Sequence, residues 1–275
     1  MKNRLIVAGI GIPALLAVIF FAPLWGWAVV VAVMASFSAW ELLHTVLGER
    51  FRVRFGIYAG LAAAAIPLGT AFGYEMVTLR CAGSCLFFVL FLELMISVQR
   101  GGEKIPFTDV AVGLFGGVIL SLMLSALVRL GFHTPKAAFI LITFVVVWLC
   151  DSGAFFVGSA MGRHKLAPAL SPKKSIEGAV GGLIAAVAAL MLFGLVLKLT
   201  GCWVRFGYLA IYGLVGGVVG QLGDLAFSAI KREYGVKDYS NLLPGHGGML
   251  DRFDSTIFTA PVLELLILWI PAFGM

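Results

Sequence analysis

The sequence predicts an all-α, polytopic integral membrane protein of about nine transmembrane helices, with the N-terminus inside and the C-terminus outside. Three observations predict this fold class: the composition, the length of the apolar stretches and the placement of the basic residues. Hydrophobic residues make up 61% of the 275 residues and charged residues 12%, and the mean hydropathy is +1.03. Soluble domains are about half apolar and about a quarter charged, so this composition belongs to the membrane class.

The apolar residues are grouped in nine stretches, each close to the roughly 20 residues that a helix needs to cross a bilayer. Each stretch is predicted to be helical, because a backbone in lipid must satisfy its own N–H and C=O groups. The stretches lie at residues 5–22, 25–47, 55–73, 82–98, 108–130, 138–160, 176–199, 206–230 and 255–273. No small-x-small cleavage site ends the first stretch, so we expect a retained span and not a signal peptide.

The basic residues set the orientation. With the N-terminus in the cytoplasm, fifteen of the 20 Lys and Arg residues fall on the inner side. The other five are Arg80, Arg129, Lys136, Lys198 and Arg205. Cytoplasmic segments carry an excess of Lys and Arg, which predicts N-in, C-out. The net charge of +6, held in these short clusters, therefore reflects topology and does not indicate a nucleic-acid partner.

Two of the predicted cytoplasmic loops, 161–175 and 231–254, are long and rich in Gly, Pro, Lys and His. Polar loops on a rigid scaffold are where function concentrates. We therefore divide the chain into transmembrane scaffold helices at 1–137, which could hold dimer contacts, and a catalytic transmembrane region at 138–275. The absence of an internal repeat counts against a transporter built from inverted halves.

Five carboxylates lie within the apolar stretches or at their ends, where an ionisable group is costly and is a functional candidate. They are Glu41, Glu93, Asp151, Asp224 and Glu264. Interfacial snorkelling also accounts for Glu41, which is near a cytoplasmic end, and a structural role also accounts for Glu93. Glu264 stands alone in an apolar turn.

Asp151 and Asp224 have polar or small neighbours at helical spacing. Gly158 and Gly162 follow Asp151 and allow close helix approach. One helix face combines Asp224 with Gln221, Ser228 and Lys231. This face predicts a functional site, with a hydrogen-bonded structural stripe as the alternative.

The loop at 231–254 combines a glycine turn with carboxylates and cations. Backbone N–H groups of the turn Pro244–Gly248 can point at an anion. Asp251 and Asp254 follow at i, i+3 on one helix face. Carboxylate oxygens are suitable Mg²⁺ ligands, so we predict Asp224 and Asp251 as the metal ligands, with Asp254 and Asp151 as further candidates.

Cations beside carboxylates and a glycine turn are what phosphoryl transfer requires. We therefore predict Asp224, Asp251, Asp254, Lys231 and Arg232 as catalytic residues. The predicted substrate-binding residues are Lys173, Lys174, Arg163, Ser228, Lys237, His246, Gly247, Gly248 and Arg252. Taken alone, the lysine pair at 173–174 is also a common signal of a cytoplasmic loop.

At these residues the sequence closely resembles the phosphatidate cytidylyltransferase (CDP-diacylglycerol synthase) family. Residues 228–254 match the family signature S-x-aliphatic-K-R-x4-K-D-x-small-x2-L-P-x-H-G-G-x2-D-R-x-D throughout. Residues 151–178 are similar to D-[ST]-G-A-[YF]-F-x-G…S-P-K-K-[ST]-x-E-G, with Ser at 152 and 175 where Thr is commoner, and Ile176 in place of Trp. These departures concern a stacking role at 176 and leave the phosphate chemistry intact. Before residue 151 the likeness is only one of hydropathy.

The resemblance implies that CTP and phosphatidate react to give CDP-diacylglycerol and pyrophosphate. It also implies an Mg²⁺ requirement, with a second monovalent or divalent cation as a further candidate cofactor, and a homodimer in the membrane lipid. We expect a bacterial cytoplasmic membrane, an active site facing the cytoplasm and no nucleic-acid partner.

Two alternative functions remain open from the sequence. A CTP-dependent polyprenol or lipid kinase would use the same phosphate chemistry and release CDP. An ion-coupled transporter, from a different class, would use Asp151 and Asp224 as relays. The Gly-His-Gly-Gly turn at 245–248 counts against the transporter.

Overall fold

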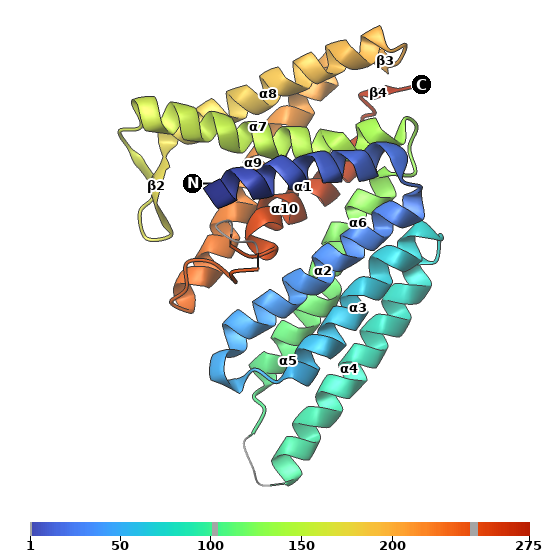
Figure 1. The fold of residues 1–275 in the computed structure, drawn as a ribbon, viewed down its shortest axis with the longest axis vertical. Helices are drawn as coiled ribbons and strands as arrows, with labels where there is room; N and C mark the ends of the chain where they lie inside the picture. The colour runs from blue at the N-terminus through green and yellow to red at the C-terminus, as the bar shows by residue number, and fades with distance from the viewer. Residues whose placement is uncertain (1, 101–103, 243–246) are drawn as a thin grey trace. The chain divides into compact units, whose positions relative to one another are not determined.

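The computed structural model describes residues 2–100, 104–242 and 247–275, with side chains from residue 9 onward. In this part of the chain, eight of the nine predicted apolar stretches each coincide with one α-helix, and the stretch 108–130 coincides with two α-helices joined by a π-helical turn (Figure 1). The helices are α1 (Lys2–Phe21), α2 (Leu24–Leu47), α3 (Val53–Ala71), α4 (Glu75–Gln99), α5 (Phe107–Leu114), α6 (Ser121–Leu130), α7 (Lys136–Met161), α8 (Ile176–Leu199), α9 (Phe206–Glu233) and α10 (Leu250–Trp269). A 3-10 turn, η1 (Gly48–Arg50), follows α2, and a π-helical turn, η2 (Phe115–Leu120), joins α5 to α6. The prediction of a helical protein is confirmed.

The chain is an integral membrane protein. Among the described residues, seven helices are long and apolar enough to cross a bilayer: α2 with η1, α3, α4, the joined α5–α6, α7, α8 and α9. The part of α1 with described side chains, Gly9–Phe21, is a shorter apolar helix. The prediction of nine spans in an N-in, C-out arrangement stays a prediction.

Local sequence fixes several helix starts. Pro23, Pro106 and Pro135 stand at the N-caps of α2, α5 and α7. Proline has no N–H and cannot continue a preceding helix, but it is tolerated at a helix start, where the N–H has no intrahelical partner. At α8 the cap is a side chain: Ser175 Oγ accepts a hydrogen bond of 3.1 Å from Gly178 N–H, the usual role of a serine N-cap.

Two short antiparallel β-ribbons accompany the helices. Strand β1 (Lys165–Ala167) pairs with β2 (Ser171–Ser175), with Lys165 opposite Ser175. Strand β3 (Trp203–Val204) pairs with β4 (Phe273–Gly274). The segment 161–175, predicted as a loop, is therefore in large part a β-hairpin. Its strands are too short and too polar to show the alternation by which a strand is recognised in a sequence.

The chain divides into two compact units. Unit 1 contains Met1–Arg129 and Tyr234–Arg252, and unit 2 contains Leu130–Glu233 and Phe253–Met275. In unit 1, α3 packs against both α2 and α4. The predicted division into a scaffold at 1–137 and a catalytic region at 138–275 is a functional one and stays a prediction.

Unit 2 is built on the pair α7 and α8, which lie side by side, with α9 packed against α8 (Figure 1). Its core contains Ile142, Val146, Leu190, Tyr212 and Leu263. The Tyr212 hydroxyl donates a hydrogen bond of 2.8 Å to the Ile270 carbonyl, so the polar end of this buried ring is satisfied. This core holds the polar residues of α7, α8 and α9 in a defined arrangement.

Candidate functional site

A pocket of about 410 Å³ lies in unit 2, among α7, the β1–β2 hairpin, α8 and α9. Its lining includes four of the sequence-predicted residues, namely Asp151, Lys173, Lys174 and Asp224. The rest of the lining is Ala154, Phe155, Gly158, Ser159, Leu166, Ser175, Gly178, Ala179 and Gln221. The structure therefore brings together two carboxylates from separate apolar helices and two lysines from the hairpin.

Two of the lining residues, Lys174 of β2 and Asp224 of α9, form an ion pair. The Lys174 ammonium donates to Asp224 Oδ2, and the Ser228 hydroxyl donates to Asp224 Oδ1 at 3.3 Å. The two charged side chains are 28% and 26% exposed, so water partly screens the pair and it contributes little to stability. The pair nevertheless places a cation and a carboxylate side by side where a phosphate could reach both.

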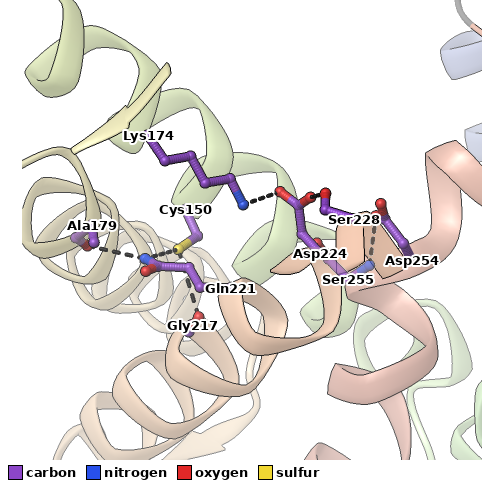
Figure 2. A network of polar contacts seen from close by, with 9 residues as sticks. All are labelled: Cys150, Lys174, Ala179, Gly217, Gln221, Asp224, Ser228, Asp254 and Ser255. Atoms are coloured by element: carbon purple, nitrogen blue, oxygen red, sulfur yellow. Dashed lines mark hydrogen bonds and ion pairs between the residues drawn. The ribbon is translucent and has the colours of Figure 1, made fainter. Parts of the chain in front are cut away.

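The predicted polar face of α9 is present (Figure 2). Gln221 Nε2 donates to the Ala179 carbonyl at 3.0 Å and to Cys150 Sγ at 3.3 Å. Gln221 thus connects α9 to both α7 and α8, while Asp224, one turn further on, faces the pocket. Gln221 therefore has the structural, hydrogen-bonded role that was the alternative for this face, and the functional role of Asp224 stays a prediction.

Asp254 of α10 adds a carboxylate to this group. Its side chain is buried, with 8% exposed, and Oδ1 accepts a hydrogen bond of 2.7 Å from Ser255 N–H. It interacts electrostatically with Asp224, Lys231 and Asp151, and Lys231 is itself buried at 8% exposure. Unit 2 therefore gathers three carboxylates, with Lys174 paired to Asp224 and Lys231 near Asp254.

The hairpin that carries the lysines is fixed at its base. Glu177, in the first turn of α8, accepts hydrogen bonds from Arg163 N–H at 3.0 Å and His164 N–H at 3.2 Å. Its other oxygen lies 2.6 Å from His164 Nδ1. The Arg163 side chain, a predicted phosphate ligand, is exposed.

Near the tip of the hairpin, Arg232 Nε donates to the Leu170 carbonyl at 3.2 Å. One predicted catalytic cation therefore contacts the backbone of this hairpin.

Close packing accompanies this hairpin base, as the glycines at 158 and 162 predict. A Cβ at Gly162 would lie 2.6 Å from Ser175 Oγ, and one at Gly158 would lie 3.1 Å from the same atom. The end of α7 therefore approaches the N-cap of α8 too closely for larger side chains. This approach fixes where β2, and with it Lys173 and Lys174, leaves the helix pair.

The remaining predicted site residues belong to unit 1. Asp251 Oδ2 accepts hydrogen bonds from Tyr239 N–H at 2.8 Å and Gly248 N–H at 2.9 Å. Gly248, the last residue of the predicted anion-binding turn, therefore donates to a carboxylate of the chain itself. Gly247 has a φ of 85°, a conformation that favours glycine.

Lys237 and Arg252 are exposed. His246 lies outside the described residues, as do Pro244 and Gly245 of the same turn.

The described residues do not form a metal site made of protein ligands alone. Within residues 2–100, 104–242 and 247–275, no three His, Cys, Asp or Glu side chains are grouped so that they could hold a metal ion by themselves. Mg²⁺ is commonly bound by one or two carboxylates together with waters and substrate phosphates. Asp224, which already attracts a cation and a hydroxyl donor, fits such a ligand.

The sequence did not predict the burial and the hydrogen bonds of one carboxylate, Glu41. Glu41 of α2 was interpretable as a snorkelling side chain, but it is buried, with 3% exposed. It accepts hydrogen bonds from Ser240, Met249 and Leu250. By contrast, Glu93 forms an ion pair with Arg54, in keeping with a structural role.

Comparison with known proteins gives consistent relatives. The sequence model described as "Cytidylyltransferase family" matches residues 2–270. A phosphatidate cytidylyltransferase of Staphylococcus haemolyticus is 37% identical over 222 residues, which cover 78% of this chain and 79% of that protein. A phosphatidate cytidylyltransferase of Bacillus subtilis is 50% identical over 123 residues, which cover 45% of each chain. A phosphatidate cytidylyltransferase of Staphylococcus aureus is 46% identical over 132 residues, which cover 47% of this chain and 49% of that protein. The last two alignments thus span about half the length of those relatives.

Proposed function

The chain belongs to the cytidylyltransferase family, and from this premise we propose that it transfers the cytidylyl group of CTP to phosphatidate. The products are CDP-diacylglycerol and pyrophosphate. The observation that carries the proposal is the pocket of unit 2, in which Lys173, Lys174 and Asp224 lie beside the apolar side chains of Phe155 and Leu166. Phe155 is 69% exposed on a membrane-spanning helix. Such a pocket suits a substrate that combines phosphate charge with an acyl-bearing body.

The chemistry is an in-line displacement at phosphorus. A phosphate oxygen of phosphatidate forms a bond to the α-phosphorus of CTP, and the bond from that phosphorus to the bridging oxygen breaks, so pyrophosphate leaves. A phosphate monoester carries about −1.5 to −2 charges at neutral pH, so the nucleophile needs no strong general base. Catalysis then depends on positioning and on neutralising charge.

The cations of the chain take the positioning role. Lys173, Lys174 and Arg163 hold the phosphates of CTP, while Lys231 and Arg232, at the end of α9, are close to the transferring centre. Ser228 keeps the Asp224 carboxylate oriented through its hydrogen bond. Lys237, Arg252 and the turn His246–Gly248 complete the proposed substrate contacts, on the basis of the sequence motif.

The proposed metal ligands are Asp224 and Asp251, with Asp254 and Asp151 as further candidates and a second cation as a further cofactor. Bound Mg²⁺ supplies positive charge to phosphate oxygens as a Lewis acid. The Asp224 contacts with Lys174 and Ser228 support this assignment, because the carboxylate oxygens face groups that favour negative charge. The proposed setting is a homodimer in a bacterial cytoplasmic membrane, with nine spans and both catalytic segments on the cytoplasmic side.

Product analysis tests the function. Purified protein with Mg²⁺, CTP and phosphatidate in mixed micelles is expected to release pyrophosphate and CDP-diacylglycerol in equal amounts. No pyrophosphate should appear when phosphatidate is left out. A CTP-dependent lipid kinase would instead release CDP and leave a lipid with an additional phosphate, and that result would replace the proposed function.

The side of the membrane is tested by cysteine labelling. Ser171→Cys in β2 and Tyr234→Cys after α9 are introduced, one at a time, in a protein whose four native cysteines are replaced. Both are expected to resist an impermeant thiol reagent in intact cells and to react after the membrane is opened. Thr200→Cys, at the opposite end of α8, is the matched control and should react in intact cells. Labelling of residue 171 or 234 from outside would overturn the orientation.

A further inference from the structure

Glu41 connects α2 to a segment almost 200 residues later in the same unit. Its Oε1 accepts hydrogen bonds from Ser240 Oγ at 2.6 Å and Met249 N–H at 2.9 Å. Its Oε2 accepts one of 2.7 Å from Leu250 N–H. Both oxygens of this buried carboxylate are therefore committed to residues that stand on either side of 243–246.

The physical chemistry explains why a carboxylate suits this position. A buried carboxyl group is costly unless hydrogen bonds compensate the loss of water, and three donors do so here. Leu250 is the first residue of α10, and a helix N-terminus favours a nearby anion. A Cβ at Gly248 would lie 2.5 Å from Glu41 Oε2, so the approach of the carboxylate requires glycine at 248.

The same segment holds a predicted metal ligand. Asp251 directly follows Leu250, and its Oδ2 accepts the N–H groups of Tyr239 and Gly248. Thr45, one helical turn after Glu41 on α2, donates to the Tyr239 carbonyl at 3.4 Å. The position of the Asp251 side chain is therefore set by backbone groups that Glu41 and Thr45 in turn hold against α2.

We propose that Glu41 is a positioning residue: it fixes the backbone around Gly248 and Leu250 and, through it, orients Asp251 for metal and phosphate. Glu41 does not itself touch the substrates. The inference rests on the proposed function for the role of Asp251, whereas the contact between Glu41 and the segment is independent of it. Residues one step removed from a ligand typically change metal affinity or activity about ten- to a hundredfold.

Glu41→Gln is the informative variant. Glutamine keeps one acceptor oxygen, but its NH₂ group replaces the other carboxylate oxygen. That NH₂ group then faces a backbone N–H, so two donors oppose each other. The expected result is a fall in kcat of about tenfold, together with a higher Mg²⁺ concentration for the half-maximal rate. The KM for phosphatidate should stay unchanged. Hydrogen exchange of the full-length protein should rise at the amides of Met249 and Leu250.

Three variants serve as comparisons. Glu93 lies on another membrane helix of unit 1, and its carboxylate pairs with Arg54. The variant Glu93→Gln removes this carboxylate and should leave the Mg²⁺ dependence at the wild-type value. Ser240→Ala removes one of the three donors, so it should shift the Mg²⁺ dependence in the same direction but less, and it should add little to Glu41→Gln. Glu41→Asp keeps the charge and should recover part of the wild-type Mg²⁺ dependence.

Two results would overturn the proposal. One is faster exchange at Met249 and Leu250 with a wild-type rate and Mg²⁺ dependence, which would make the contact purely structural. The other is a lower specific activity with unchanged Mg²⁺ dependence and unchanged exchange, which would reflect only less folded protein. Failure of the proposed function would look different, as an inactive wild-type protein in which Glu41→Gln still accelerates exchange.

Discussion

Replacing Asp224 with asparagine is expected to lower kcat about a hundred- to a thousandfold, the magnitude typical of losing one preorganised electrostatic contact. Asparagine is nearly isosteric and retains an oxygen that can accept the Ser228 hydroxyl. It removes the negative charge that attracts Lys174 and that we propose for Mg²⁺. The protein should therefore remain folded and inserted while the chemistry is lost.

The measurement is the rate of pyrophosphate release over a wide range of Mg²⁺ concentrations. Glu264→Gln is the control, since it changes a carboxylate of α10 in the same unit that is not part of the pocket lining, and it should be mild. Asp251→Asn should also abolish most turnover, although its remaining oxygen can still accept the N–H groups of Tyr239 and Gly248. Substantial activity of Asp224→Asn at every Mg²⁺ concentration would show the ligand assignment to be wrong.

Lys173 and Lys174 of the hairpin are expected to share an effect on the KM for CTP and to differ in their effect on the Mg²⁺ dependence. Both lie in the pocket lining, so alanine at either should raise the KM for CTP. A charge-assisted hydrogen bond contributes about 1.5–3 kcal/mol, which corresponds to a loss of about ten- to a hundredfold in kcat/KM for CTP. Contacts made equally in the ground and transition states change KM more than kcat, so kcat should fall less.

Only Lys174 should also change the metal dependence. Its ammonium is paired with Asp224, so a cation at that carboxylate must displace it. Lys174→Ala is therefore expected to lower the Mg²⁺ concentration for the half-maximal rate, whereas Lys173→Ala should leave it unchanged.

Steady-state kinetics in mixed micelles, with CTP, phosphatidate and Mg²⁺ each varied, separates these effects. Lysines near a membrane surface also attract anionic lipid, which is the competing interpretation. A selective rise in the KM for phosphatidate would move both lysines from the nucleotide to the lipid.

Features that depend on near neighbours in the sequence were predictable. Among the described residues, apolar length located eight single helices and the joined segment α5–η2–α6. Helical spacing placed Gln221, Asp224 and Ser228 on one face of α9, where the structure has them. Boundaries were less accurate: the stretch predicted at 82–98 begins at Glu75. The polar first turns of α4 resemble a loop, but Glu75 pairs with Arg129 of α6, which gives this charged helix start a partner that hydropathy does not reveal.

Features that depend on distant partners were not predictable. Glu41 stands alone in an apolar sequence, and its donors Ser240, Met249 and Leu250 are 199, 208 and 209 residues away. Nothing in the local pattern distinguishes such a carboxylate from one that snorkels to the interface. The β1–β2 hairpin was not predicted for a different reason: its pairing joins short polar segments without hydrophobic alternation. The metal assignment stays a prediction from residue type and motif.

The contact between Glu41 and residues 240–250 also constrains how the chain is made. Ribosomes add about 5–20 residues per second, so some 10–40 seconds separate synthesis of α2 from synthesis of its partners. During that interval the Glu41 carboxyl has none of its final donors, and it must be tolerated at the membrane by water, lipid headgroups or the insertion machinery. We therefore expect chains truncated before residue 240 to insert with α2 poorly anchored and to be degraded, whereas chains that extend past Leu250 persist. Pulse-chase measurement of the half-lives of the two truncated chains tests this, and equal half-lives would show that α2 is secured without its late partners.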